Sequence, residues 1–167
     1  MRWAICSRII SGMSSIRSAT EIPASARRAI FSLAVSIGGD AIIGSTYAEL
    51  MPLFEADEQT QGIVIYSEPG GRMEAELARW VSERSSRLAI VAFMAGRFMD
   101  EMPGMSFGHA GTIVEGKEDT ANEKIARLAE AGISVAERIE DIPEMIRERI
   151  AQRTGSAAAA GEGSRSR

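Results

Sequence analysis

The chain has 167 residues, 45% of them hydrophobic, which is the size and composition of one ordinary domain with a buried core. Its 19 basic and 23 acidic residues are interspersed and give a net charge of −4, so the sequence has neither a basic stripe for nucleic acid nor a polybasic membrane patch. The lone Cys6 and lone His109 disfavour a disulfide or a zinc site, no other metal ligands are indicated, and the longest apolar runs are far too short to span a membrane.

The first twenty residues allow two interpretations. They contain three arginines, five serines and no acidic residue, a composition typical of a transit peptide, which would place the protein in the mitochondrial matrix. The alternative, which we favour, is a short buried strand at residues 3–6 followed by a serine-rich turn, with the protein in the cytoplasm. Residues 16–32 predict a helix over part of their length only, because Pro23 near the middle disfavours a straight one.

Strand and helix signals alternate through the rest of the chain. Short apolar runs that are typical of buried strands occur at residues 33–37, 62–66, 87–93 and 133–135. Segments with apolar residues at helical spacing occur at residues 46–56, 73–83, 121–131 and from 141 onward. In the first of these helices Leu50, Leu53 and Phe54 share one apolar face. The short connections predict an α/β fold of three layers, with helices on both faces of a central parallel sheet.

The domain predicted from these signals covers residues 1–152, with residues 1–32 its least certain part. Residues 153–167 are rich in alanine, glycine and serine with scattered charge. Such a composition predicts a disordered tail.

Three glycine-rich loops follow the predicted strands, and in parallel sheets the loops after the carboxyl ends of the strands form the ligand site. These loops contain Gly38-Gly39-Asp40, Ser67-Glu68-Pro69-Gly70-Gly71 and Gly108-His109-Ala110-Gly111. The glycines either make tight turns or let the backbone approach a ligand closely, and Asp40 either caps a helix or shapes the site. His109 can serve as a nucleophile, base or phosphate carrier near neutral pH, although an isolated histidine is more often structural.

These motifs, with Gly44-Ser45 between them, resemble in order and spacing the ligase domain of the succinyl-CoA synthetase α subunit. The same domain type occurs in malate-CoA ligase, ATP-citrate lyase and ADP-forming acyl-CoA synthetases. The similarity runs from about residue 33 to residue 150. It includes Thr120-Ala121-Asn122-Glu123-Lys124 and Glu130-Ala131-Gly132-Ile133, which look like the segment that follows the histidine in that family.

The resemblance implies a flavodoxin-like fold and a phosphohistidine intermediate. In the family, acyl-CoA, ADP or GDP, and phosphate exchange with the acid, CoA and the nucleoside triphosphate. His109 aligns with the histidine that carries the phosphoryl group, and Glu68 with the glutamate that orients it. Ser7-Arg8 and Ser11-Gly12 are similar to the family's Ser-Arg-Ser-Gly turn, which holds the phosphate, with two isoleucines between them. The expected phosphate-binding residues are Ser11, Gly12, Gly38, Gly39, Gly70, Gly71 and Gly108.

The chemistry requires a neutral His109 as the nucleophile, and an unperturbed pKa of about 6.5 makes that form the majority at neutral pH. Glu68 would accept the proton of the other ring nitrogen and so fix the tautomer; the alternative for Glu68 is an exposed acid in a turn. An anion at a helix N-terminus gains only about 0.3–1 kcal/mol, up to about 2 when partly buried. Several amides and a metal-bound nucleotide from a partner would therefore be needed.

The sequence lacks a Walker-type Gly-x-x-x-x-Gly-Lys motif for ATP. The resemblance implies that Mg-ATP or Mg-GTP binds a separate β subunit, to which a mobile loop presents His109. The family's α subunit carries a CoA-binding domain ahead of this region, so we expect CoA to bind a domain supplied in cis or in trans. Two alternatives to a catalytic domain are a non-catalytic module that docks to a β subunit and a degenerate fragment of marginal stability. The acyl substrate is left open.

Overall fold

The computed structural model describes residues 3–8, 31–38, 44–105, 116 and 120–163. Its strands are β1 (Trp3–Arg8), β2 (Phe31–Ser36), β3 (Thr60–Ser67), β4 (Ala89–Met94) and β5 (Ser134–Ala136). Its helices are α1 (Tyr47–Ala56), α2 (Met73–Glu83), α3 (Ala121–Glu130) and α4 (Ile142–Gly163), with short 3₁₀ helices η2 (Arg97–Glu101) and η5 (Ile139–Asp141). Each predicted strand and helix from residue 33 onward has a counterpart among these elements.

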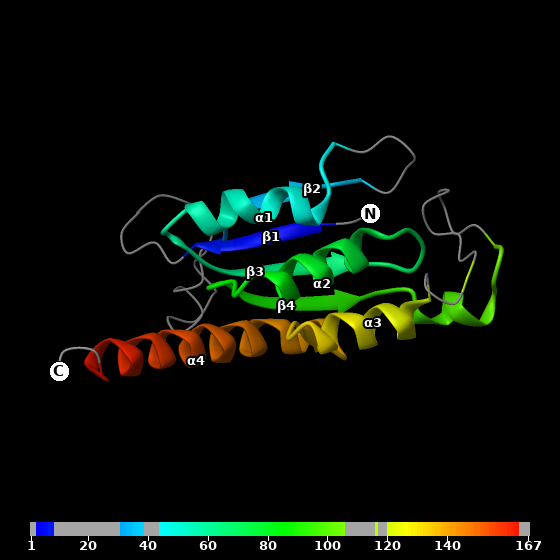
Figure 1. Cartoon of the computed structure of the whole chain (residues 1–167). Helices are drawn as coiled ribbons and strands as arrows, with labels where there is room; N and C mark the ends of the chain where they lie inside the picture. Colours follow the sequence, from blue (N-terminus) through cyan, green and yellow to red (C-terminus); the bar gives the residue numbers. More distant parts are fainter. Residues whose placement is uncertain (1–2, 9–30, 39–43, 106–115, 117–119, 164–167) are drawn as a thin grey trace, which may run out of the picture.

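One five-stranded sheet, in the order β2-β1-β3-β4-β5, forms the centre of the molecule (Figure 1). β3, β4 and β5 are parallel, whereas β1 runs antiparallel to both of its neighbours. Ser36 of β2 and Tyr66 of β3 both lie opposite Trp3, so β2 points in the same direction as β3. The α/β, flavodoxin-like fold is confirmed. The reversed direction of β1 was not predicted, because apolar composition indicates that a strand is buried and not which way it runs.

Helices cover both faces of the sheet: α1, α2 and α3 lie on one face and α4 on the other (Figure 1). The alternation of side chains along each strand supplies both cores. On β3, Ile63 and Ile65 pack on the α1–α3 side, while Val64 packs against α4. The apolar composition of β3 and β4 follows directly, because most residues on both faces of these strands are buried.

The start of α1 is fixed by a capping box. Thr46 Oγ1 accepts a hydrogen bond from the amide of Glu49 at 3.3 Å, and the Glu49 carboxylate accepts one from the amide of Thr46 at 2.8 Å. The buried side chains of α1 are Tyr47, Met51 and Phe54. Leu53, expected on the apolar face with Phe54, is instead 67% exposed. The helix is turned so that the face beginning at Tyr47 meets the sheet.

Helix α4 runs to Gly163, so residues 153–163 are helical where the composition predicts disorder. Alanine has the highest helix propensity of the amino acids and occupies positions 157–160, so it can continue a helix that has already begun at Ile142. The end of α4 extends beyond the sheet (Figure 1). Among the described residues, no helix is both long and apolar enough to cross a membrane.

Candidate functional site

The carboxyl ends of β2, β3 and β4 meet at one edge of the sheet. Because Ser36 and Tyr66 flank the same residue of β1, the ends of β2 and β3 lie two strand spacings, about 10 Å, apart. The amide of Ala95 donates to the carbonyl of Ser67 at 2.8 Å, so the loops after β3 and β4 leave the sheet side by side. The Tyr47 hydroxyl donates to the Tyr66 carbonyl at 3.1 Å and brings the start of α1 to the same edge.

Four of the predicted site residues lie in the described part of the chain, and all four are at this edge: Glu68, Gly38, Gly70 and Gly71. The others lie outside the described residues: His109, Ser11, Gly12, Gly39 and Gly108, together with Asp40. The pairing of Glu68 with His109 therefore stays a prediction.

The loop of residues 68–71, here called the Glu68 loop, turns the chain from β3 into α2. Gly70 and Gly71 have φ angles of +83° and +68°, in the left-handed region that glycine adopts without a steric penalty. Glu68 itself is half-buried. These angles suit the tight turn that the sequence allows as one role of the two glycines, and their binding of phosphate stays a prediction. Arg72, at the N-cap position of α2, makes no capping hydrogen bond with its side chain. The first turn of α2 contains Glu74 and Glu76.

A buried lysine donates hydrogen bonds to the backbone of the Glu68 loop. Lys124 Nζ, on α3, donates to the carbonyls of Glu68, at 3.2 Å, and of Gly70, and it forms an ion pair with Glu74 Oε2 at 2.7 Å. The second oxygen of Glu74 accepts a hydrogen bond from Ser67 Oγ. Ser67, Glu74 and Lys124 are only 0%, 1% and 2% exposed. These three side chains, here called the Lys124 cluster, join β3, α2 and α3.

Sequence reasoning did not single out the Lys124 cluster, although a signal exists. The buried residues of α3 are Ala121, Lys124 and Leu128, and Glu74 is buried beside Leu77 on α2. A charged residue at a position of the apolar stripe of a helix must find a partner, because burial of an unpaired charge is very costly. Two opposite charges that each interrupt such a stripe indicate a buried pair.

Asp100 connects the loop after β4 to the start of α3. Its two carboxylate oxygens accept hydrogen bonds from the amides of Ala121, at 2.7 Å, and Asn122, at 3.1 Å. Thr120 Oγ1 accepts from the amide of Glu123 at 3.3 Å. The first amides of α3 are thus satisfied by side chains of the protein itself. Asp100 precedes and Ala121 follows the segment that contains His109, so this contact holds the flanks of the segment together.

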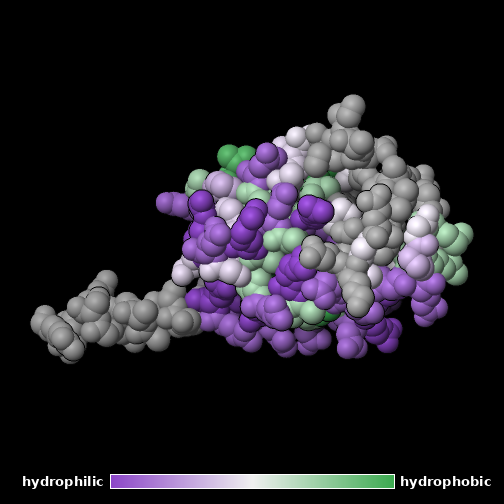
Figure 2. Space-filling view, turned by 45° about the vertical axis from the view of Figure 1, so that its right-hand side comes forward, coloured by the Kyte–Doolittle hydropathy of each residue, from purple (hydrophilic) through white to green (hydrophobic). Residues whose placement is uncertain are grey.

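Apolar side chains are exposed next to these flanks. Phe98, Met102 and Met105 are exposed, whereas Met99 is only 6% exposed and packs inside. Figure 2 shows hydrophobic side chains at the end of the molecule that carries the loop after β4. Exposed methionines are adaptable apolar contacts, which suits a surface that meets another protein or domain.

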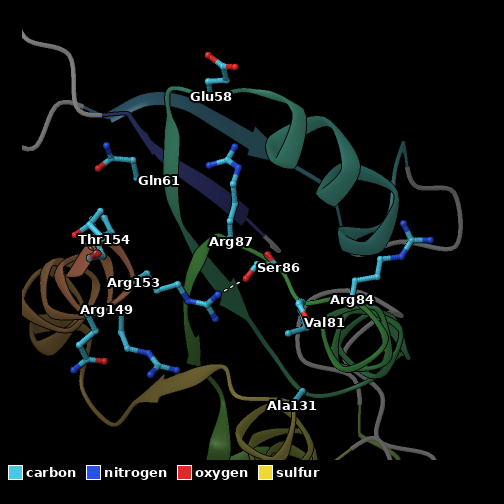
Figure 3. Close-up of a pocket in the computed structure, with 13 residues that line it drawn as sticks. Glu58, Gln61, Val81, Arg84, Ser86, Arg87, Ala131, Arg149, Arg153 and Thr154 are labelled. Atoms are coloured by element: carbon cyan, nitrogen blue, oxygen red, sulfur yellow. Dashed lines mark hydrogen bonds between the residues drawn. The ribbon is translucent and has the colours of Figure 1, made fainter. Parts of the chain in front are cut away.

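The opposite edge of the sheet carries an open cavity of about 830 Å³ that is lined by arginines (Figure 3). Arg153 points to Ser86 and donates to its carbonyl, and Arg149 donates to the carbonyl of Gly132 at 2.6 Å. Arg87 donates to backbone carbonyls of the α1–β3 connection. These guanidinium groups hold connections together, and no predicted site residue lines the cavity. Among the described residues, no group of three potential metal ligands is found.

The model of the CoA-ligase family matches residues 27–134 of the chain. The chain is 40% identical over 116 residues to subunit alpha 1 of an ADP-forming succinate–CoA ligase from Archaeoglobus fulgidus. It is 39% identical over 113 residues to a subunit of an ADP-forming sulfoacetate-CoA ligase from Bilophila wadsworthia. These stretches are 70% and 68% of this chain, and the chain spans 38% of the length of each relative.

Among solved structures, the chain is similar to an ATP citrate lyase from Methanosaeta concilii in complex with (3S)-citryl-CoA. The TM-score is 0.64 and the sequence identity 28%, over 71% of this chain and 19% of that one. An ATP citrate lyase from Methanothrix soehngenii in complex with citrate and coenzyme A is similar with a TM-score of 0.66 and 27% identity, over 74% of this chain and 20% of that one.

Proposed function

Because the chain belongs to the CoA-ligase family, we propose that it is the ligase domain of an ADP- or GDP-forming acyl-CoA synthetase and carries a phosphoryl group on His109 during turnover. The observation that carries the proposal is the position of Glu68. Glu68 is half-buried and follows β3 at the carboxyl edge of the sheet. The loop that carries it is bonded to the buried ion pair of Lys124 and Glu74. The flanks of the His109 segment are joined at the same edge by Asp100.

In the proposed step, a neutral ring nitrogen of His109 attacks the γ-phosphorus of the nucleoside triphosphate. The N–P bond forms as the bond to the nucleoside diphosphate breaks, and the diphosphate leaves. Glu68 accepts a hydrogen bond from the other ring nitrogen, which fixes the tautomer and stabilises the positive charge that the ring gains. Backbone amides of the Glu68 loop and of Gly38, with those of Gly39 and Gly108, bind the phosphoryl oxygens. Ser11 and Gly12 are left out of this step, because β1 runs opposite to β3 and Arg8, three residues before Ser11, pairs with Thr60 at the far end of β3.

The remaining substrates bind elsewhere in this proposal. Mg-ATP or Mg-GTP binds a ligase β subunit, and CoA binds a CoA-binding domain in cis or in trans. The names of the two relatives indicate the class of acid: succinate and sulfoacetate are both short acids with a second anionic group. We extend that class, a small dianionic acid, to the substrate of this protein.

The test uses the fact that His109 is the chain's single histidine. The chain is incubated with a matched ligase β subunit and Mg-[γ-³²P]ATP, and protein-bound phosphate is measured after acid and after alkali. We expect acid-labile, alkali-stable phosphate on the wild type and none on His109→Asn. Stable binding of the β subunit with no phosphate on the wild type would show a docking module instead and would overturn the proposal.

A further inference from the structure

We propose that Lys124 is a positioning residue for the phosphorylation of His109: through the Lys124 cluster it holds the Glu68 loop in its working geometry. This inference rests on the function proposed above. In this role Lys124 acts through the backbone on either side of Pro69.

The bonding of the Lys124 ammonium group argues for this role. An ammonium group donates through its N–H bonds, and among the described residues Nζ donates to the carbonyls of Glu68 and Gly70 and to a carboxylate oxygen of Glu74. A buried ion pair by itself adds little stability over apolar side chains of similar size. An apolar side chain, however, cannot bind two carbonyl groups of a turn. The cluster therefore supplies backbone geometry that packing alone does not.

The contacts bracket Glu68 in the chain. On its N-terminal side, the Ser67 hydroxyl is bonded to Glu74, and the Ser67 carbonyl accepts from the amide of Ala95. On its C-terminal side, the Glu68 and Gly70 carbonyls are bonded to Lys124. With both flanking peptide groups fixed, the Cα–Cβ direction of Glu68 is fixed as well.

Helix α3 is a common frame for the two halves of the site. Lys124, in the first turn of α3, donates to the Glu68 loop. Ala121, the first residue of α3, donates to Asp100, which precedes the His109 segment in the chain. A rigid helix therefore sets the position of the Glu68 loop relative to the flanks of that segment. A displacement of about 1 Å between catalytic groups lowers a rate by about 100-fold, so such a frame has a large effect.

The decisive variant is the double substitution Lys124→Met with Glu74→Met. It replaces the buried pair by apolar side chains of similar size, which restores the core and removes the hold on the loop. With the full chain, a matched β subunit and Mg-[γ-³²P]ATP, we expect its single-turnover rate of His109 phosphorylation to fall about 10- to 100-fold. Its melting temperature should exceed that of Lys124→Met alone. Arg87→Met, which weakens contacts at the opposite edge of the sheet, is the matched control and should keep its rate within about two-fold.

A second readout reports geometry without turnover. With ¹⁵N-labelled histidine, the single imidazole gives one pair of ring-nitrogen signals, whose shifts measure the ratio of the two neutral tautomers. Glu68→Gln should change this ratio and slow phosphorylation, and the double variant should change the ratio in the same direction. The inference is overturned if Glu68→Gln is impaired but the double variant is phosphorylated at the wild-type rate and shows the wild-type tautomer ratio. An unimpaired Glu68→Gln, or a wild type that takes up no phosphate, overturns the proposed function instead.

Discussion

At the scale of single residues, loss of one partner of the pair of Lys124 and Glu74 has a large expected effect on stability. Both side chains are almost fully buried, 2% and 1% exposed, and each neutralises the other. Removal of one partner leaves an uncompensated charge in a medium of low dielectric constant, which typically costs about 3–5 kcal/mol. Replacement of both partners removes that penalty.

Lys124→Met should therefore lower the free energy of unfolding by about 3–5 kcal/mol in urea denaturation. Addition of Glu74→Met should recover part of the loss, because it removes the unpaired charge but not the loss of the hydrogen bonds to Ser67 and to the Glu68 and Gly70 carbonyls. Arg127→Met is the control on the same helix. Arg127 pairs with Glu123 at 3.1 Å, but the two side chains are 30% and 49% exposed, so the loss there should stay below about 1 kcal/mol. Equal losses for Lys124→Met and Arg127→Met would contradict the assignment of a tightly buried pair.

The sequence predicted Glu68 at the sheet edge and missed Lys124 for a physical reason. Glu68 follows a continuous apolar strand directly, so the topology of a parallel sheet places it. The position of Lys124 depends on how two helices pack on the sheet, and Glu74, its partner, is 50 residues away in the chain. Local patterns show that each charge interrupts an apolar stripe, but only the packing shows that the two charges meet.

At the scale of elements, α3 depends on a cap supplied from outside its own sequence. Asp100, in η2, binds the amides of Ala121 and Asn122. A carboxylate at this place satisfies two of the four amides that a helix leaves without partners, and it interacts favourably with the helix dipole. The cap also fixes η2 to α3, so its loss should loosen both elements.

Asp100→Ala should lower the free energy of unfolding by about 1 kcal/mol, within the range of about 0.5–2 kcal/mol measured for lost caps. Amide hydrogen exchange should rise selectively in the first turn of α3. The neighbouring Glu101 is exposed, and Glu101→Ala is the control that should change neither quantity. Unchanged exchange in α3 for Asp100→Ala would show that the cap contributes nothing to the helix.

Most elements were predictable, and the exceptions have separate causes. α2 has the predicted bounds because its apolar residues repeat at helical spacing and the Glu68 loop marks its start. Leu53 was placed on the wrong face because three apolar side chains fit two neighbouring stripes of a helix, and only contact with the sheet selects one. The helical end of α4 was missed because a composition that suits a linker also contains the best helix formers.

At the scale of the whole molecule, the two edges of the sheet differ in what their polar groups do. At the carboxyl edge, the loops carry the proposed catalytic residues, and their polar contacts fix the loops to α2 and α3. At the amino edge, arginine side chains donate to backbone carbonyls and close the connections between elements. The polar contacts of the amino edge thus lie away from the proposed chemistry, at the opposite ends of the same strands.

This division is tested by Arg87, which lies just before β4 and donates to the carbonyls of Phe54, Asp57 and Thr60. The Arg87 side chain is 42% exposed, so water can replace part of the hydrogen bonding that its removal would cost. We expect Arg87→Met to lower the free energy of unfolding by about 2 kcal/mol. Arg84→Met, which removes the stacking of Arg84 on Trp80 at 5.4 Å, should cost about 0.5–1 kcal/mol. Below the melting temperature, both variants should accept phosphate from Mg-ATP and the β subunit at the wild-type rate. A folded Arg87→Met variant that phosphorylates slowly would mean that the two edges are coupled through the sheet, because the strands that connect them are rigid and buried on both faces.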